Sequence, residues 1–272
     1  MPPTTTPFRQ IRAKCDRTPA TTTLTSPVAT SINTHDREDD LITVYQAYNA
    51  AIATAACAAQ RLDASPRFKL TRMTWVKPSW CWMMYRAGYS HKDANQERIL
   101  ALRMRRADLW ALLRMAELTT RAPSPTITSD AAKVAGGASA RNGKAGHRDG
   151  NDPAKDGDIV KDRAGESHAS GVKSDKVKVQ WDPERDAHIE KLAYRSIQIG
   201  IPAALAARWI AEWIVDITDV TDTARELKMT LDEEPTIADG ELVERGLCPV
   251  EEEIVVPADL REILRMDLPD TA

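Results

Sequence analysis

The sequence predicts an α+β protein whose core is one mixed sheet, built from both halves of the chain and flanked by helices. Short runs rich in β-branched and aromatic residues predict strands, and helical patterns lie between them without strict βαβ alternation. Two long low-complexity stretches interrupt these patterns. The length of 272 residues, 42% of them hydrophobic, is enough for one large domain.

Before the second low-complexity stretch, strands and helices follow one another closely. Leu41–Tyr48 (LITVYQAY) is β-branched and aromatic, which is typical of a strand. One helix is expected to have Pro78 in its first turn, where a missing N–H is tolerated, and Gly88 as its C-cap. The expected strands are 41–48 and 97–104, residues 72–76 are expected to be short and extended, and the expected helices are 50–61, 78–88 and 107–118.

After that stretch, Lys176–Trp181 (KVKVQW) alternates polar and apolar residues with the period of a half-buried strand. The expected strands are 176–181, 194–200 and 213–218, and the expected helices are 202–212 and 219–229. Because neither half holds enough strands to be stable alone, we expect one sheet that combines them. Residues 119–175 are then an excursion from a loop.

The low-complexity stretches define the expected organisation of the chain. Residues 17–36 are rich in Thr, Ser, Pro and Ala, and residues 119–175 contain no Phe, Trp or Tyr. Such segments bury too little apolar surface to offset the loss of backbone entropy, so we expect both to be disordered insertions. A third mobile stretch is expected near Asp232. The core is then formed by 1–16, 37–118 and 176–230, and 231–272 is an acidic C-terminal segment.

Charge is unevenly distributed along the chain. The net charge of −3 does not predict nucleic-acid binding, but residues 61–117 carry twelve Lys and Arg against five Asp and Glu, a surplus of +7. Two interpretations stay open. The basic middle and the acidic end compensate each other, or the basic part binds an anionic ligand.

The four cysteines and five histidines are scattered and form no CxxC or similar pattern. This distribution favours a reducing compartment and predicts no metal site. No apolar run reaches the roughly 20 residues that span a membrane. We therefore expect an intracellular, cytoplasmic protein with no metal and no membrane partner; a nuclear location is not excluded.

The first cluster of candidate site residues lies at an expected strand-to-helix junction, RMTWVKPSW at 72–80. Lys77 and Arg86 supply positive charge, Ser79 supplies a hydroxyl, and a helix N-terminus suits a phosphate or carboxylate. Trp75 can stack on a base or ring. The structural alternative is that the tryptophans pack in the core and the cations lie on the surface.

The second cluster, QWDPER at 180–185, is expected to end a strand and turn at Asp-Pro. Asp182 and Glu184 are candidate catalytic acid–base groups, and Gln180 and Trp181 can orient a ligand. The structural alternative is a helix start, with Asp182 as N-cap, proline in the first turn and Glu184 as first-turn charge.

Polar and aromatic side chains on two further strands complete the candidate ligand-binding set. By period two, Ser196 and Gln198 share one face of the strand 194–200, where they line a pocket or face water. On the first strand, Gln46 and Tyr48 share a face. The candidates on these strands are Tyr45, Gln46, Tyr48, Arg195, Ser196 and Gln198.

The motifs TVYQAY, RMTWVKPSWCWMMYRAGY, QERILAL, VQWDPERD and YRSIQIG occur in this order and resemble the family named domain of unknown function 4291. The resemblance begins at Phe8–Ala13, ends near Met266, and is interrupted at 17–36 and 119–175. It implies a shared scaffold and supplies no established activity.

Two hypotheses for function follow. The first is an enzyme that acts on a nucleotide-like substrate, NAD or another nucleotide, in which cations hold phosphates, an aromatic ring stacks on the base and a carboxylate acts as general base or stabilises a developing cation. These roles fall to Lys77, Arg86 and Arg195, to Trp75 or Tyr48, and to Glu184 or Asp182. A narrower version, by fold-level analogy, is ADP-ribosyltransferase-like group transfer. The second hypothesis is a non-catalytic RNA- or protein-binding module that uses the basic 61–117 region.

Overall fold

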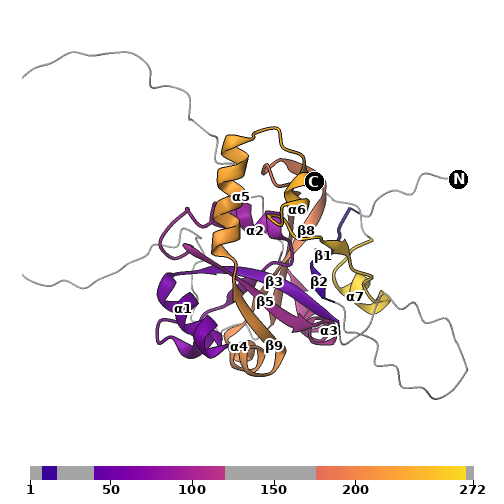
Figure 1. Ribbon diagram of the computed structural model, residues 1–272. Helices are drawn as coiled ribbons and strands as arrows, with labels where there is room; N and C mark the ends of the chain where they lie inside the picture. Colours follow the sequence, from indigo (N-terminus) through magenta and orange to yellow (C-terminus); the bar gives the residue numbers. More distant parts are fainter. Residues whose placement is uncertain (1–7, 17–39, 120–175, 268–272) are drawn as a thin grey trace, which may run out of the picture. The chain divides into compact units, whose positions relative to one another are not determined.

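The computed structural model describes residues 8–16, 40–119 and 176–267, which all belong to one compact unit of the chain (Figure 1). The expected disordered insertions at 17–36 and 119–175 lie outside these residues, apart from Thr119. Strands and helices are mixed without regular alternation, which confirms the α+β class.

The described strands are β1 (Arg12–Ala13), β2 (Cys15–Asp16), β3 (Leu41–Tyr48), β4 (Thr74–Val76), β5 (Arg98–Arg105), β6 (Ala116–Leu118), β7 (Val177–Arg185), β8 (Lys191–Ile201), β9 (Ile214–Asp219) and β10 (Glu252–Glu253). The α-helices are α1 (Ala50–Ala59), α2 (Trp80–Ala87), α3 (Arg106–Arg114), α4 (Ala203–Arg208), α5 (Thr221–Glu233), α6 (Asp239–Glu244) and α7 (Ala258–Ile263). A 3₁₀ turn spans Leu62–Ala64, and a π-helical turn spans Trp209–Trp213.

The described strands form three sheets, which corrects the prediction of a single sheet. Two sheets have four strands, in the orders β2-β3-β5-β9 and β4-β8-β7-β6, and the third pairs β1 with β10. The β6–β7 pair is parallel and the other pairs are antiparallel. Each sheet combines strands from both halves of the chain.

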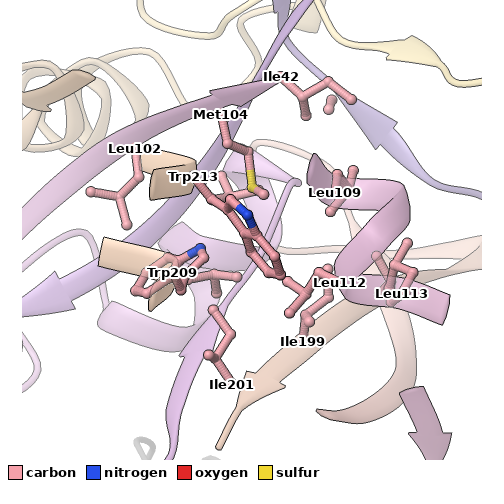
Figure 2. Packing of buried hydrophobic residues seen from close by; sticks show 14 of the residues in the cluster. Ile42, Leu102, Met104, Leu109, Leu112, Leu113, Ile199, Ile201, Trp209 and Trp213 are labelled. Carbon is pink, nitrogen blue, oxygen red and sulfur yellow. The ribbon is translucent and has the colours of Figure 1, made fainter. Parts of the chain in front are cut away.

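Two layers form because each four-stranded sheet has an apolar face to bury. Leu102 and Met104 on β5 and Ile199 and Ile201 on β8 belong to one buried cluster. Two tryptophans from the turn after α4, labelled in Figure 2, pack between these side chains. Packing of the two apolar faces on a common core removes both from water.

The two four-stranded sheets are joined at a backbone bridge between Tyr45 of β3 and Lys77, the residue after β4. The Tyr45 N–H donates to the Lys77 carbonyl at 2.7 Å, and the Lys77 N–H donates to the Tyr45 carbonyl at 3.0 Å. This bridge fixes the chain that enters α2 beside β3.

The outer face of β3 and β5 is also covered. A second buried cluster joins this face to α2, α5 and α6, and Figure 1 shows these three helices on the same side of the strands. Its members include Tyr45, Met83, Met84, Ile99, Ala101, Ala224, Leu227 and Leu242.

The chain after Asp232 is folded, so the expected mobile stretch is not found there. Helix α5 continues to Glu233, and α6, β10 and α7 follow before residue 267. Leu242, Leu260 and Leu264 are buried, so this segment contributes to the core despite its acidic composition. Among the described residues, no helix is long and apolar enough to cross a membrane.

The prediction of an Asp-Pro turn at Asp182 is wrong. Strand β7 continues to Arg185, with an irregular register between Pro183 and Arg185 in its pairing with β8. A proline is tolerated in a strand at such a bulge, because the ladder does not need its missing N–H there. Asp182 is therefore neither in a turn nor a helix cap.

Three helix boundaries also differ from prediction. Ser79 is the N-cap of α2, so Pro78 precedes the helix instead of occupying its first turn. Helix α3 ends at Arg114, because residues 116–118 pair with β7 as a strand. The helix after Pro202 extends as a π-helical turn to Trp213, which was expected to begin a strand.

Candidate functional site

A buried carboxyl group meets the start of α2. Glu184 on β7 is 2% exposed, and its Oε1 accepts hydrogen bonds from Ser79 Oγ at 2.9 Å and from the Arg185 N–H at 2.8 Å. Ser79 Oγ also accepts the Trp82 N–H at 3.0 Å, which caps the helix. The side chain of one helix cap thus orients the carboxyl.

Glu184 lines a cavity of about 300 Å³, the Glu184 cavity, which also contains Arg12, Ser79, Arg185, Tyr194 and Glu251. Its walls come from β1, the start of α2, β7, β8 and the segment before β10. Groups that are distant in sequence therefore surround one space of a size that holds a small ligand.

A second carboxyl group, that of Glu251, faces the same cavity. Its Oε1 accepts the Trp80 N–H at 2.6 Å, and the Arg12 guanidinium donates to its backbone carbonyl at 2.8 Å. Burial of the carboxyl raises the pKa of Glu251 well above its ordinary value, and the nearby Glu184 adds to this rise.

Burial likewise raises the pKa of Glu184, while the hydrogen bonds from Arg185 and Ser79 oppose the rise. Ser196 Oγ is buried close to this carboxyl and lowers its pKa, although it makes no hydrogen bond of normal geometry within the described residues. Two carboxyl groups that both resist ionisation therefore line one cavity, where ionisation of Glu184 opposes that of Glu251.

A group of cations surrounds Asp182, which lies two residues before Glu184 on β7. We define the cationic patch as Lys77, Arg86 and Lys92 together with Asp182. Lys77 is 6% exposed and its Nζ donates to the Trp75 carbonyl at 3.2 Å. The pKa of Lys77 is lowered to about 7, mainly by burial, and the charges of Arg86 and Lys92 add to this lowering while Asp182 opposes it. The patch therefore gathers like charges around one carboxylate.

Asp182 is held by the amides of two glutamines. Gln180 Nε2 donates to its Oδ1 at 2.9 Å, and Gln198 Nε2 donates to its Oδ2 at 2.7 Å. Burial raises the pKa of Asp182, and these hydrogen bonds and the neighbouring cations oppose that rise. The carboxylate is thereby fixed between β7 and β8.

The structure thus brings together eight of the predicted site residues. They lie on the outer face of β7 and β8, where the chain enters α2, or in the last turn of α2. They are Lys77, Ser79, Arg86, Gln180, Asp182, Glu184, Ser196 and Gln198.

Trp75 lies beside this group, on β4, with its ring across Gly200 of β8. A Cβ atom on Gly200 would lie 2.9 Å from the ring and 2.8 Å from Met73 Sδ. The absence of a side chain at position 200 therefore lets the indole lie flat on the sheet.

Five predicted residues lie elsewhere. Trp181 Nε1 donates to the Leu264 carbonyl and Arg195 donates to the Trp181 carbonyl, so neither joins the Glu184 cavity. Gln46 and Tyr48 both contact Thr74 Oγ1. Tyr45 lines a different cavity, described below.

The sequence motifs did not indicate Arg12, Tyr194 or Glu251 as site residues. Arg12 and Glu251 lie in the short strand pair β1–β10 and beside it, which forms between opposite ends of the chain. A local pattern carries no signal for such a pair. The segment PVEEEIVV around Glu251 resembles the family's closing segment, and this resemblance was the signal that could have indicated Glu251.

The basic surplus of residues 61–117 is partly compensated within the fold, by four carboxylates from outside this region. At least six of its cations pair with carboxylates, several from other parts of the chain. These pairs are Arg61–Asp63, Arg98–Asp219, Arg103–Asp216, Arg105–Asp108, Arg106–Asp40 and Arg114–Asp259. In the described ranges, no group of His, Cys, Asp or Glu has the arrangement of a metal site.

Residues 31–253 match the family model described as Domain of unknown function (DUF4291), and the chain belongs to this family. No curated protein and no solved structure matches the chain.

Proposed function

For this member of the DUF4291 family, we propose an enzyme that binds a nucleotide-like ligand, NAD or another nucleotide, and acts on it with Glu184. The observation that carries the proposal is the buried Glu184 carboxyl, oriented by Ser79 and facing a cavity with Glu251. A carboxyl group kept in a cavity against its desolvation cost is more typical of an acid–base site than of a stabilising contact.

Glu184 and Glu251 supply the chemistry. Each raised pKa favours the protonated carboxyl, and ionisation of one opposes ionisation of the other. One group can therefore donate a proton to a leaving group while the other, once ionised, accepts a proton or stabilises a developing cation.

The cationic patch supplies the ligand's counter-charge. Lys77, Arg86 and Lys92 repel one another, and an anionic group between them would relieve that repulsion. Phosphate suits the site, because a guanidinium binds phosphate oxygens in a bidentate way and an ammonium adds a point charge. Ser79 lies two positions after Lys77, and Glu184 lies two positions after Asp182. A phosphate at the cationic patch and a reacting atom at Glu184 would therefore lie within one nucleotide's length.

The narrower version of the proposal is group transfer from NAD, as in ADP-ribosyltransferases. It requires a carboxylate beside the bond to nicotinamide, and we assign this role to Glu184. The alternative, a non-catalytic RNA- or protein-binding module that uses the basic 61–117 region, has less support, because at least six cations of that region are already paired with carboxylates.

A thermal-shift titration of the full chain with NAD, NADP, ATP and GTP tests ligand binding. A nucleotide at 100 times its dissociation constant should stabilise the fold by about 2.7 kcal/mol and raise the Tm by roughly 5–10 °C. Absence of a shift with every nucleotide would overturn the proposal.

Release of nicotinamide from NAD, followed by chromatography, tests the chemistry. Glu184→Gln should lower the rate at least about 100-fold, as loss of a general acid–base group does. Glu117→Gln changes an exposed carboxylate of β6 and is the matched control, which should keep its activity. Nucleotide binding without nicotinamide release would remove the transferase version and leave the broader one.

A further inference from the structure

A second and larger cavity lies on the outer face of the sheet β2-β3-β5-β9. It has a volume of about 450 Å³ and is closed by the start of α5 and by the loop before β10. We call it the Tyr45 cavity. The lining residues used below are Lys14, Thr43, Tyr45, Trp80, Arg103 and Thr223.

Two aromatic rings form the inner wall. The centroids of Tyr45 and Trp80 are 5.2 Å apart, and the rings meet edge to face at 66°. Both residues are almost fully buried, so their positions are fixed by the packing of β3 against α2. A rigid aromatic wall favours a flat ring as its ligand.

The Tyr45 hydroxyl is a polar group without a protein partner. Tyr45 is 3% exposed, and its hydroxyl makes no hydrogen bond to any other residue of the described ranges, yet it is not sealed from the cavity. The same holds for the buried Thr43 hydroxyl on the same strand face. Buried polar groups are normally hydrogen-bonded, so an unpaired pair that lines a cavity points to a ligand with polar edges.

The charges of the cavity are confined to its rim and compensate one another. Arg103 pairs with Asp216 at 3.1 Å and with Asp16 at 3.5 Å, and Lys14 lies 3.9 Å from Asp16. The inner wall carries hydroxyl, aromatic and aliphatic groups but offers no counter-ion. Because an unpaired charge is costly to bury, the part of a ligand that enters must be uncharged.

We propose that the Tyr45 cavity binds an uncharged heteroaromatic ring with hydrogen-bonding edges, of the nucleobase or nicotinamide class. The ring lies against the edges of Tyr45 and Trp80 that line the cavity and exchanges hydrogen bonds with the hydroxyls of Tyr45 and Thr43. A sugar or phosphate attached to it remains at the rim, where the paired charges give a phosphate little additional affinity.

This site is separate from the Glu184 cavity and does not rest on a catalytic role for Glu184. The two cavities have Cys248 and Pro249 as common wall residues, but Tyr45 and Thr43 line the first, and Glu184 and Tyr194 line the second. Each cavity therefore has its own tyrosine, which provides matched variants.

Calorimetric titration of the full chain with nicotinamide and the four ribonucleosides tests the proposal. At least one of these probes should bind with a millimolar or tighter dissociation constant. Tyr45→Phe removes one hydroxyl and should weaken binding about five- to tenfold. Thr223→Leu, at the half-buried first turn of α5, fills the cavity and should abolish binding while the Tm stays close to that of the parent.

Tyr194→Phe is the control and should leave the dissociation constant unchanged, because Tyr194 lines the other cavity. A nucleoside monophosphate should bind within about threefold of its nucleoside. The proposal is overturned if no probe binds, if Tyr45→Phe and Thr223→Leu bind like the parent, or if Tyr194→Phe weakens binding as much as Tyr45→Phe. Equal binding of indole, which lacks the polar edges, would also overturn it.

Discussion

Ser79 Oγ lies 2.9 Å from Glu184 Oε1, although 105 positions separate the two residues. The same hydroxyl caps α2 by accepting the Trp82 N–H. One serine thus fixes both the start of a helix and the direction of a buried carboxyl group. Loss of its hydroxyl affects the fold and the candidate site together.

Ser79→Ala should lower the free energy of unfolding by about 2–4 kcal/mol, because it removes a helix cap and a donor to a buried carboxyl. Urea denaturation measures this change. Asn49→Ala is the matched control, since Asn49 caps α1 through Oδ1 without contacting a buried acid, and should lose about 1 kcal/mol. Equal losses in the two variants would show that the Glu184 contact contributes nothing.

Glu251→Gln should stabilise the protein at pH 8 and have little effect at pH 4.5. The pKa of Glu251 is raised in the folded state, so the folded state binds more protons than the unfolded state, and wild-type stability falls as pH rises through the folded pKa. Glutamine lacks this titration and can still accept the Trp80 N–H. Urea denaturation at both pH values measures the difference.

In the same experiment, Glu117→Gln should destabilise the protein at pH 8 and have less effect at pH 4.5. Hydrogen bonds from Lys178 and Lys176 lower the pKa of Glu117, so its contribution is present above the unfolded pKa and is lost as pH falls. If the difference in free energy of unfolding between Glu251→Gln and wild type does not change between pH 4.5 and pH 8, the raised pKa of Glu251 is contradicted.

Lys77→Met should stabilise the protein most at pH 6 and progressively less toward pH 9. The pKa of Lys77 is about 7 in the folded state, below its unfolded value, so the unfolded state binds more protons between these two values and wild-type stability rises with pH there. Each pKa unit corresponds to about 1.4 kcal/mol, so the difference between wild type and variant should change by several kcal/mol. Urea denaturation at pH 6, 7.5 and 9 follows it, and a constant difference would contradict the burial of a neutral amine.

Gly200→Ala should cost about 1–3 kcal/mol, because the new methyl group would lie within van der Waals distance of Trp75 and Met73 and displace them. The displaced indole should also weaken nucleotide binding to the cationic patch. Gly240→Ala is the control within α6, where nothing lies within 4 Å of the added Cβ, and it should stabilise by roughly 0.5–1 kcal/mol. Thermal denaturation and the thermal-shift titration check both effects.

Deletion of residues 122–172 should leave folding and ligand binding intact. Strands β6 and β7 are parallel, with Ala116 opposite Val177, so the connection must return along the length of β6. The segment removed lies within the stretch 119–175, which has no Phe, Trp or Tyr and so offers little apolar surface to a core. Thermal denaturation of the shortened chain measures the outcome.

The two halves expressed separately should be insoluble or unfolded, because each sheet needs strands from both. A soluble N-terminal half ending at Glu117 that melts cooperatively would contradict this expectation.

Local patterns predicted the long elements well. Leu41–Tyr48 was predicted as a strand and is one, because its β-branched and aromatic side chains suit a strand buried on both faces. The strand character of Ala116–Leu118 could not be predicted, since it depends on pairing with Val177–Val179 far along the chain. The prediction of a turn at Pro183 was wrong for a related reason: the bulge that accommodates this proline forms only in the pair with β8.

The candidate site was likewise predictable where local residue types indicate it and not where it depends on distant pairing. Lys77, Asp182 and Glu184 were chosen for their residue types, and the structure brings them to one face. Glu251 was missed because its proximity to Glu184 depends on the β1–β10 pair, which no local pattern encodes. The division of the strands into three sheets was missed because period-two alternation gives the buried face of each strand but not the sheet to which it belongs.

The pairing of Arg12 with Glu253 has a consequence for biosynthesis. The first described strand can pair only after the last, β10, has been made, and β5 likewise pairs with β9. A nascent chain on the ribosome therefore exposes unpaired strand edges until β9 and β10 have emerged. Chaperones that shield such edges should raise the yield of this protein more than slower translation does.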